Sequence, residues 1–451
     1  MEFDRLQEIV RQAGIVGAGG AGFPSYAKLN MAADTVILNC SECEPLLKLH
    51  RQLLMRYARE IMMTLQEIVD TLGADRAIIA VKHAYTETVD AIRAHLSEFP
   101  KVEISLLEEF YPAGDEVITV YETTGRVIAP GALPISVGCV VYNVETVYNI
   151  YRAWKENAPV THKYVTVAGE VKNPCTLKLP LGVTFGEVLD MVGGATVRDF
   201  AIISGGPMTG RVTSPADIVT KTTNAILVFP KNSHIIQKKL TPLMINVRRA
   251  MAACCQCRMC TDLCTRHALG HPIEPHKLMN AVASGVASDT NAFLGAFSCS
   301  SCGLCEMYSC GQGLNPAGII AATKGELRKN GVQPPKLPAK AVEPHREHRK
   351  VSMDRLIARL GLNKYDLPAP MVDVEIQPRR VKLRLAQGIG APAVATVSVG
   401  QEVAQGEQIA TFDPAKLGTS IHSPIDGVVT EVSDILVRVE LKNGKKTKGR
   451  A

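Results

Sequence analysis

The sequence predicts a multidomain α/β protein in which a helical, cysteine-rich region and a β-rich C-terminal domain follow the α/β part. Strands alternate with amphipathic helices over about the first 155 residues, which is typical of a three-layer α/β domain. Two regular cysteine runs lie between residues 254 and 310, and short strands with glycine turns occupy 376–441. The chain has 451 residues, 46% of them hydrophobic, which is enough for three or four domains with separate cores.

Residues 1–155 are expected to form a Rossmann-like α/β domain. Each predicted strand is a short apolar run, and each predicted helix has apolar residues three or four positions apart. Helices are predicted at 3–14, 50–72 and 84–97, and strands at 35–39, 76–82, 102–106 and 137–143. Ligands of such open sheets bind beyond the carboxyl ends of the strands, so residues that follow the strands are candidates for a binding site.

A glycine-rich loop follows the first predicted helix and contains Gly17, Gly19, Gly20 and Gly22. Without a Cβ atom, glycine lets the backbone amides come close to a ligand such as a phosphate. The loop follows a helix instead of a strand, so it lacks the usual context of a dinucleotide-binding fingerprint. A tight turn between helices remains the open alternative.

The segment N-C-S-E-C-E-P, residues 39–45, comes directly after a predicted buried strand. Its polar residues Asn39, Ser41, Glu42 and Glu44 therefore stand where polar groups would meet a nucleotide at the sheet edge. Its two cysteines lie outside the regular runs and are expected to be ordinary small residues.

Eight cysteines indicate two [4Fe–4S] clusters. The first run has the spacing C-x2-C-x2-C-x3-C and the second C-x2-C-x2-C-x4-C. Three closely spaced thiolates can hold three corners of a cubane, and in two-cluster ferredoxins the fourth cysteine of each run binds the other cluster. The predicted ligand sets are Cys254, Cys257, Cys260 and Cys310 for one cluster, and Cys299, Cys302, Cys305 and Cys264 for the other. A protein with two such clusters is expected to move electrons.

Two other interpretations of the cysteines are weaker. A zinc ribbon uses four ligands and leaves the third cysteine of each triplet unexplained. A disulfide framework is typical of short secreted chains, whereas this chain has 451 residues and thirteen cysteines, an odd number. Cys255 is surplus and could be a spare thiol or an alternative first ligand.

The composition excludes several classes of protein. The formal charge of +6 is mild and aromatic residues make up 5%, so the sequence lacks the basic clusters with interleaved aromatics of a nucleic-acid binder. The N-terminus does not read as a signal peptide. No run of eighteen apolar residues occurs, so no transmembrane segment is expected. The expected location is the cytoplasm.

Three further segments complete the predicted organisation. Residues 160–232 combine alternating strands, a short helix and the glycine loop S-G-G-P-M-T-G, and residues 240–330 should place the clusters on a helical scaffold. Residues 331–375 are rich in proline and charge and are expected to be a linker. Residues 376–441 read as a small β-sandwich.

Four motifs in the first domain resemble a known family. G-x-G-G-A-G-F-P with a following lysine, N-x-x-E-x-E-P, Y-P-x-G-x-E and N-V-E-T occur here in that order. They resemble the flavin domain of the C subunit of the Rnf electron-transport complex and, more distantly, the FMN- and NADH-binding subunit of respiratory complex I. The complex I pattern has an arginine in the glycine loop, where this chain has Ala18.

This resemblance implies roles for individual residues. For the phosphate side of FMN it implies Gly17, Gly19, Gly20 and Lys28. For the isoalloxazine and ribityl groups it implies Asn39, Ser41, Glu42 and Asn143. For the NADH side it implies Glu44, taken as the catalytic residue, together with Gly114, Asp115 and Glu116, while Phe23 would stack on a ring.

The later domains extend the resemblance. Residues 160–232 resemble a soluble-ligand-binding (SLBB-like) β-grasp domain, with a spacer role as the simpler alternative. Residues 376–441 resemble biotinyl and lipoyl barrel-sandwich hybrid domains, and Lys416 falls at the position of the modified lysine, although the flanking residues of a modification site are absent. In the Rnf C subunit this module is N-terminal, whereas here it is C-terminal.

The domain order most resembles the cobalamin reductases of propanediol-utilisation microcompartments. That resemblance implies electron transfer from NADH through FMN and the clusters to cobalamin, with a cob(I)alamin adenosyltransferase and microcompartment shell or cargo proteins as partners, inside a bacterial microcompartment. No D-x-H-x-x-G signature of cobalamin binding occurs. The alternatives are an Rnf-type electron-input subunit that docks on a membrane or ferredoxin partner, and a scaffold with vestigial clusters, against which eight intact ligands argue.

Overall fold

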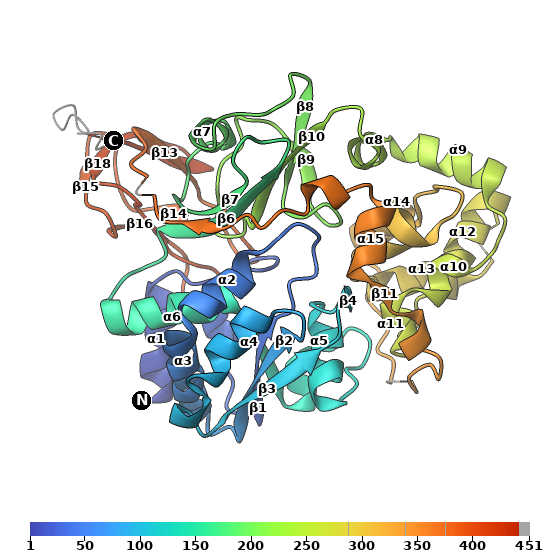
Figure 1. Ribbon diagram of the computed structural model, residues 1–451, viewed down its shortest axis with the longest axis horizontal. Coiled ribbons are helices and arrows are strands. Elements are labelled where there is room, and N and C mark those ends of the chain that lie inside the picture. The colour runs from blue at the N-terminus through green and yellow to red at the C-terminus, as the bar shows by residue number, and fades with distance from the viewer. Residues whose placement is uncertain (287, 339, 375, 442–451) are drawn as a thin grey trace.

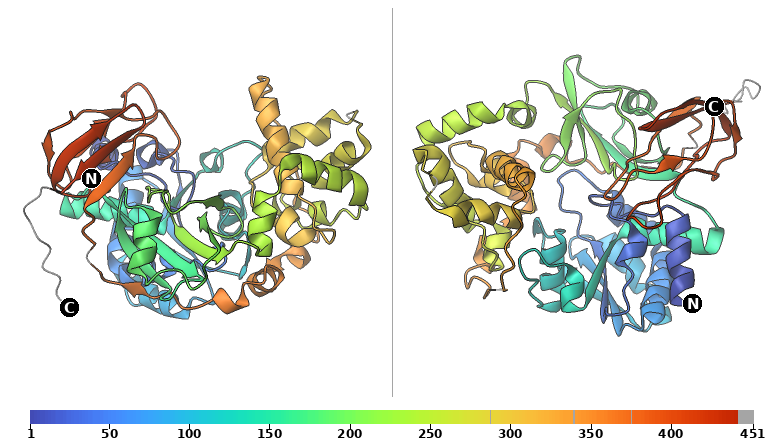
Figure 2. Two further views of the ribbon diagram at one scale, coloured as in Figure 1. Left: turned by 90° about the horizontal axis from the view of Figure 1, so that it is seen from above. Right: turned by 180° about the vertical axis from the view of Figure 1, so that it is seen from behind.

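The computed structural model describes residues 1–441 except residues 287, 339 and 375. Figure 1 shows the α/β domain of about residues 1–155 at the bottom and a β-sheet domain of about residues 160–232 above it, called the green domain here. The C-terminal β domain, drawn in red, lies beside that sheet. The helical domain of about residues 240–330, called the yellow domain, lies on the opposite side. Figure 2 shows the red and yellow domains at opposite ends of the molecule, with the green sheet between them. Within the described part of the chain, no helix is long and apolar enough to span a membrane.

The N-terminal domain is a parallel sheet between two helical layers. Its strands lie in the order β3-β2-β1-β5, with bounds Val102–Leu107, Arg76–Lys82, Thr35–Cys40 and Cys139–Asn143. Val36 and Leu38 share a core with α3 and α6, while Ile37, between them, shares a different core with α5. This alternation follows from the two-residue period of a strand. The helices are α1 (Phe3–Gln12), α3 (Ala58–Leu72), α5 (Glu116–Thr124) and α6 (Val144–Glu156).

Two predicted helices of this domain are interrupted. The helix expected over 50–72 consists of α2 (Leu49–Arg56) and α3, because Tyr57 leaves the helical conformation with φ −122° and ψ 36°. Its ring stacks on Tyr148 of α6 at 4.3 Å between centroids. The helix expected over 84–97 is α4 (Thr86–Arg93), followed by a 3-10 turn, Leu96–Glu98. Packing against a neighbouring helix therefore overrides the periodic pattern.

The green domain contains a six-stranded mixed sheet in the order β12-β7-β6-β10-β8-β9. The bounds are Met371–Val372, Cys175–Pro180, His162–Gly169, Ala225–Pro230, Phe200–Ser204 and Arg211–Thr213. Its helix α7 (Phe185–Met191) begins at a capping box in which the Thr184 hydroxyl accepts from the Glu187 amide. The expected alternation of strands, helix and glycine loop is present.

The yellow domain packs short helices around a small core of Ala250, Leu278, Ile319 and Ile320. The helices are α9 (Leu243–Ala253), α10 (Met259–Asp262), α11 (Thr265–Ala268), α12 (Pro275–Ser284), α13 (Thr290–Leu294) and α14 (Pro316–Lys329). Helix α8 (His234–Leu240), which precedes them, shares a core with the green sheet through Ile235 and Ile236. The cysteines lie in the turns and short helices of this scaffold.

The segment expected to be a linker is partly folded. Within 331–375, β11 (Val351–Ser352) pairs with β4 (Phe110–Tyr111), and α15 (Met353–Arg359) buries Leu356 and Ile357. The segment then adds β12 to the edge of the green sheet. These few apolar residues fold because neighbouring domains supply the surface that covers them. The orange segment in Figure 1 thus connects three domains.

The C-terminal domain has two small antiparallel sheets, β13-β19-β18-β15 and β14-β16-β17. The strands are β13 (Arg380–Arg384), β14 (Val394–Ala395), β15 (Glu402–Val403), β16 (Gln408–Thr411), β17 (Ile421–His422), β18 (Gly427–Val432) and β19 (Leu436–Glu440). The domain is tied to both neighbours through Lys221, whose ammonium donates to Gly14 O at 2.6 Å and Ser420 O at 2.7 Å. Burial lowers the pKa of Lys221 to about 7.

A buried ion pair joins the α/β domain to the green domain. Glu145 of α6 binds the ammonium of Lys163 of β6, and each side chain is 1% exposed. The second carboxylate oxygen of Glu145 accepts from the Tyr164 amide at 3.0 Å. A buried pair with its remaining hydrogen bonds satisfied orients the two domains.

We expect Glu145→Ala to destabilise this interface by about 3–5 kcal/mol, because it leaves the Lys163 ammonium buried without a counter-charge. The double substitution Glu145→Leu with Lys163→Met should recover much of that loss, since it removes both charges. The free energy of chemical unfolding of the full chain measures both the loss in the single variant and the recovery in the double variant. Equal stability of Glu145→Ala and the parent would contradict the assigned role.

Candidate functional site

The candidate cofactor residues meet at the carboxyl ends of β1 and β5. Asn39 and Asn143 lie opposite each other in the parallel register of these strands. The Asn39 amide donates to Gly114 O at 3.0 Å, and its oxygen accepts from the Ser41 amide at 3.0 Å. The asparagines, Ser41 and Gly114 therefore share one edge of the sheet, as expected for a ligand site of an α/β domain.

The glycine loop is held against the same edge by the N-V-E-T segment. The Thr146 hydroxyl accepts from the Ala18 amide at 3.0 Å and bonds to Val16 O at 3.3 Å. A Cβ atom on Gly19 would lie 2.4 Å from Asn143 Nδ2, so only glycine fits there without moving that side chain. Asn143 cannot simply move, because its oxygen caps α6 by accepting from the Glu145 amide.

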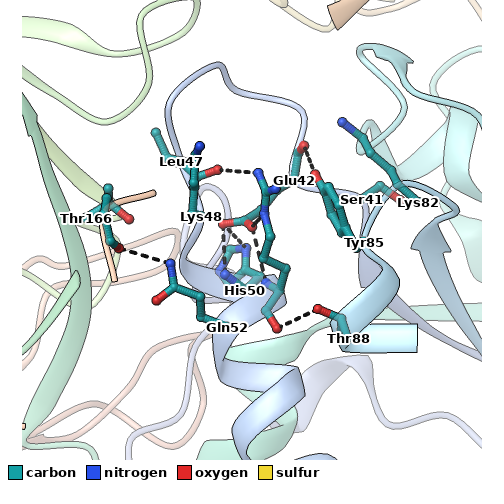
Figure 3. Close-up of polar contacts among 12 residues, drawn as sticks. Ser41, Glu42, Leu47, Lys48, His50, Gln52, Lys82, Tyr85, Thr88 and Thr166 are labelled. Carbon is teal, nitrogen blue, oxygen red and sulfur yellow. Dashed lines mark hydrogen bonds and ion pairs between the residues drawn. The ribbon is translucent and has the colours of Figure 1, made fainter. Parts of the chain in front are cut away.

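Glu42 lies buried at the start of α2, a position that its sequence motif does not predict. Its carboxylate is 2% exposed and accepts from the amides of His50 at 2.8 Å and Arg51 at 3.2 Å, at the start of α2. Tyr85 donates to Glu42 O at 3.2 Å, and the Arg51 guanidinium lies over the Tyr85 ring (Figure 3). Negative charge at a helix N-terminus is stabilising. Glu42 thus fixes the loop that follows β1.

Three buried polar atoms near this edge have no hydrogen-bond partner among the described residues: Ser41 Oγ, His50 Nε2 and Lys82 Nζ. Ser41 directly follows β1, His50 lies in α2 and Lys82 ends β2 (Figure 3). Burial lowers the pKa of both His50 and Lys82. Lys82 Nζ lies 3.9 Å from the Glu109 carboxylate, outside hydrogen-bond distance. Buried polar groups are costly unless they are paired, so Ser41 Oγ and His50 Nε2 above all fit a site that a polar cofactor such as FMN completes.

His50 and Lys82 are not among the site residues that the sequence predicts. The available signal for Lys82 was a cation at the end of the otherwise apolar strand R-A-I-I-A-V-K. No local signal singled out His50, whose Nδ1 lies 3.3 Å from Asn143 Nδ2 because α2 packs against α6, the helix that Asn143 caps.

The carboxylate of Glu44, the predicted catalytic residue, lies in a contact between two domains. Its carboxylate accepts from the amides of Met208 at 2.9 Å and Thr209 at 2.8 Å, in the S-G-G-P-M-T-G loop of the green domain. The Glu44 carboxylate is therefore engaged by another domain in this structure. The sequence could not show this, because the partners lie more than 160 positions away.

Asp115 and Glu116 are also engaged. Asp115 caps α5 through the Val117 amide and forms a bidentate pair with Arg266 of the yellow domain at 2.8–3.1 Å. Glu116 pairs with Lys28 at 2.8 Å, and Lys28 also donates to Val141 O at 3.0 Å. Lys28 lies at the site with its charge neutralised in this structure, and Asp115 works as a tether between domains.

The remaining two predicted residues lie on the glycine loop. Phe23 is half-buried, and its carbonyl accepts from the Gly17 amide at 2.9 Å. Gly20 is exposed, with no other atom within 4 Å of a Cβ placed on it. The loop is therefore tightly packed at Gly19 and open at Gly20.

The eight cysteines of the two runs lie close together in the yellow domain. Cys254, Cys257, Cys260 and Cys310 line one cavity, which Cys255 also borders. Cys264, Cys299 and Cys302 each raise the pKa of Cys305, after the larger effect of burial.

The donor sets fit iron–sulfur clusters. Burial and the neighbouring Cys257, Cys310 and Cys254 raise the pKa of Cys260 to about 12. Closely gathered thiols resist ionisation until a cation neutralises them, which is what cluster iron supplies. Cys260 also raises the pKa of Cys305, so the two groups are neighbours.

The group containing Cys302 lies next to the α/β domain. The Tyr111 hydroxyl donates to Cys302 O at 2.5 Å, and Arg266, two residues after Cys264, holds Asp115. In the other group, Cys257 is exposed, as is Cys255 beside it. We call the Cys264/299/302/305 set the inner group and the Cys254/257/260/310 set the outer group.

We expect Gly206→Ala to loosen the Met208–Thr209 loop, because its Cβ would lie 2.0 Å from Glu44 Oε2. Glu44→Gln should have the same effect, since an amide nitrogen cannot accept from those amides. Hydrogen exchange of residues 204–211 measures the change. Gly325→Ala, where a Cβ meets nothing within 4 Å, is the matched control. Parent-like protection in both variants would contradict the interpretation.

Comparison with known proteins identifies all four domains. The family models that match are the Nuo51 FMN-binding domain at 10–152, the SLBB domain at 164–212, the 4Fe-4S dicluster domain at 253–315 and the RnfC barrel sandwich hybrid domain at 367–445. They confirm the predicted fold class and the predicted cofactors, FMN and [4Fe–4S] clusters.

Curated relatives cover almost the whole chain. The cobalamin reductase PduS of Salmonella typhimurium is 42% identical over 97% of this chain and 96% of its own length, and that of Citrobacter freundii is 39% identical over 96% of each. The C subunit of the Na⁺-translocating ferredoxin:NAD⁺ oxidoreductase complex of Acetobacterium woodii is 34% identical over 59% of each chain. The chain therefore belongs to the PduS family of cobalamin reductases, the family that its sequence resembles.

Proposed function

We propose that this protein is an NADH-dependent cobalamin reductase that takes electrons from NADH at the α/β domain and delivers them singly from the cysteine domain to cobalamin. The single observation that carries the proposal is the order of the sites. The inner cysteine group borders the α/β domain through Tyr111 and Arg266, while the outer group includes the exposed Cys257. The family relationship supports cobalamin as the acceptor.

FMN would occupy the edge formed by β1, β5 and the glycine loop. When bound, FMN accepts two electrons together and releases them one at a time, and [4Fe–4S] clusters carry one electron each. The residues proposed to hold it are Gly17, Gly19, Gly20, Lys28, Asn39, Ser41, Gly114 and Asn143. His50 joins them, because its buried Nε2 has no hydrogen-bond partner among the described residues, and Lys82 joins them as a buried cation at the end of β2 whose recorded ion pair, with Glu109, is as long as 3.9 Å.

The chain's own residues exclude water and hold the two domains in place. Tyr111 is 1% exposed and stays uncharged at the boundary, since burial raises the pKa of its hydroxyl. Arg266 and Asp115 pair across the same boundary with side chains 18% and 7% exposed. A fixed, dry boundary keeps the inner group at a constant distance from the flavin edge.

In this proposal, cobalamin receives its electrons from the outer cysteine group. The proposed reaction reduces cobalamin toward cob(I)alamin, and a cob(I)alamin adenosyltransferase would trap the product as adenosylcobalamin for propanediol degradation. We place the protein with that partner among the cargo of a bacterial microcompartment.

The deciding experiment uses the full chain, purified anaerobically with FMN and iron loaded. We expect NADH, cob(III)alamin, a cob(I)alamin adenosyltransferase and ATP as the adenosyl donor together to yield adenosylcobalamin. NADH oxidation without any electron reaching cobalt would favour a subunit that passes electrons to a docking partner instead.

Gly19→Ala tests the flavin edge. Its Cβ would displace Asn143, so we expect loss of most bound FMN while iron content stays at the parent value. Flavin absorbance and iron assays measure both, and Gly325→Ala is the control. Unchanged FMN content would mean that the loop is only a turn.

Cys257→Ser and Cys302→Ser separate the two cysteine groups. Each should lower the iron content from about eight to about four per chain, as expected for two cubane clusters. Cys302→Ser should abolish cobalamin reduction while NADH oxidation by a two-electron acceptor persists. Stoichiometric zinc without iron–sulfur absorbance would contradict the assignment.

A further inference from the structure

Helix α9 lies at the outer edge of the yellow domain and leaves apolar side chains exposed (Figure 1). Met244, Arg248 and Met251 are spaced by four and three positions, so they share one face of the helix. The two methionines are 60% and 57% exposed, and Arg248 is exposed between them. Asn246 and Ala250, on a different face, are buried in the domain. Exposed apolar groups gathered on one face mark a surface for another molecule.

This exposed face of α9 leads directly to the outer cysteine group. The helix ends at Ala253, and Cys254 caps it. The exposed Cys255 and Cys257 follow in the next turn, and Met259, two positions later, is 42% exposed. A molecule that covers the exposed face of α9 would therefore lie beside the outer group.

The same surface is cationic. No acidic residue occurs between Asp217 and Asp262, and Asp262 pairs with Arg258 at 3.3 Å. The side chains of Arg248 and Arg249 are exposed, and neither has an ion pair or a hydrogen bond among the described residues. Helix α12, which packs on α9, contains no acidic residue either. Two guanidinium groups without a counter-charge thus lie next to the exposed methionines.

Arg248 decides between the possible occupants of this face. It lies between Met244 and Met251, so insertion of the face into a lipid surface would bury an unpaired charge, which is costly. Two-fold pairing of two copies of the chain would bring the same arginines against each other, because both copies would use the same face. A protein surface with carboxylates around an apolar centre satisfies the methionines and the arginines together.

We propose that the α9 face, defined as Met244, Arg248, Arg249 and Met251, docks an acidic protein that receives single electrons from the outer group. Methionine is flexible and polarisable and is common at binding surfaces. Complementary charge speeds the encounter of two proteins and fixes their register. The inference rests on the proposed function for the identity of that protein, an adenosyltransferase that carries cobalamin. Each transfer oxidises the outer group by one electron and reduces cob(II)alamin to cob(I)alamin, with NADH as the source of electrons.

The test is calorimetric titration of a cob(I)alamin adenosyltransferase, loaded with cob(II)alamin and ATP, into the anaerobically purified, FMN- and iron-loaded full chain without NADH. We expect binding that weakens as salt is added. Arg248→Gln and Arg249→Gln should each weaken it several-fold, and the double variant more than tenfold with a smaller salt dependence. Arg93→Gln, which removes an exposed arginine of α4 in the α/β domain, is the matched control.

The methionines are tested separately from the charges. Replacing Met244 and Met251 together by serine should weaken binding several-fold and leave its salt dependence unchanged, because no charge is removed. Iron and FMN contents should equal those of the parent in every variant. A fall in iron content would overturn the inference, because the face would then hold the cluster scaffold together.

Electron delivery supplies a second measurement. With NADH present and the partner below saturation, the arginine variants should reduce the partner's cobalamin several-fold more slowly, while NADH oxidation by menadione, a small two-electron acceptor, stays at the parent rate. No binding by the parent, or parent-like affinity in the double arginine variant, overturns the inference. Arginine-dependent binding to phosphatidylglycerol vesicles in place of the partner, or an arginine-dependent dimer in light scattering, also overturns it. Arginine-dependent binding of the partner without any reduction of its cobalamin would overturn the proposed function alone.

Discussion

The buried pair between Glu145 and Lys163 is the interaction on which the rest of the structure depends. Both charges are withdrawn from water, so the two domains have one favourable relative position, in which carboxylate and ammonium meet. The neighbours of Glu145 in the same short segment reach the cofactor edge: Asn143 touches Gly19, and Thr146 holds Ala18. One four-residue motif therefore fixes the loop, the helix start and the domain interface together.

Two acidic residues of the sequence motifs make contacts between domains. Glu44 holds the loop of the green domain and Asp115 holds Arg266 beside the inner cysteine group. Transfer of single electrons between sites in different domains requires a fixed separation. The acidic residues of this chain contribute to that geometry by accepting hydrogen bonds across the boundaries, and the segment containing α15 adds a further connection between the same domains.

The glycine loop is shared by two surfaces with different properties. Its Gly19 side is packed against Asn143, whereas its Gly20 side opens on a cavity lined by Arg211 and Arg384. The C-terminal domain contributes to this division, because the Ile389 amide bonds to Gly22 O and Arg384 lines the cavity.

The sequence by itself determined the order of domains, the parallel sheet and the two cysteine sets, because apolar periodicity and ligand spacing are local properties. It also determined which segments reach the sheet edge. Only the tertiary structure decided what Glu44 and Asp115 contact, where the long helix breaks at Tyr57, and that residues 351–372 fold. It alone placed His50 and Lys82 at the cofactor edge and Arg384 beside Arg211. Those outcomes depend on partners many positions away, and no local pattern encodes a charge that is satisfied by another domain.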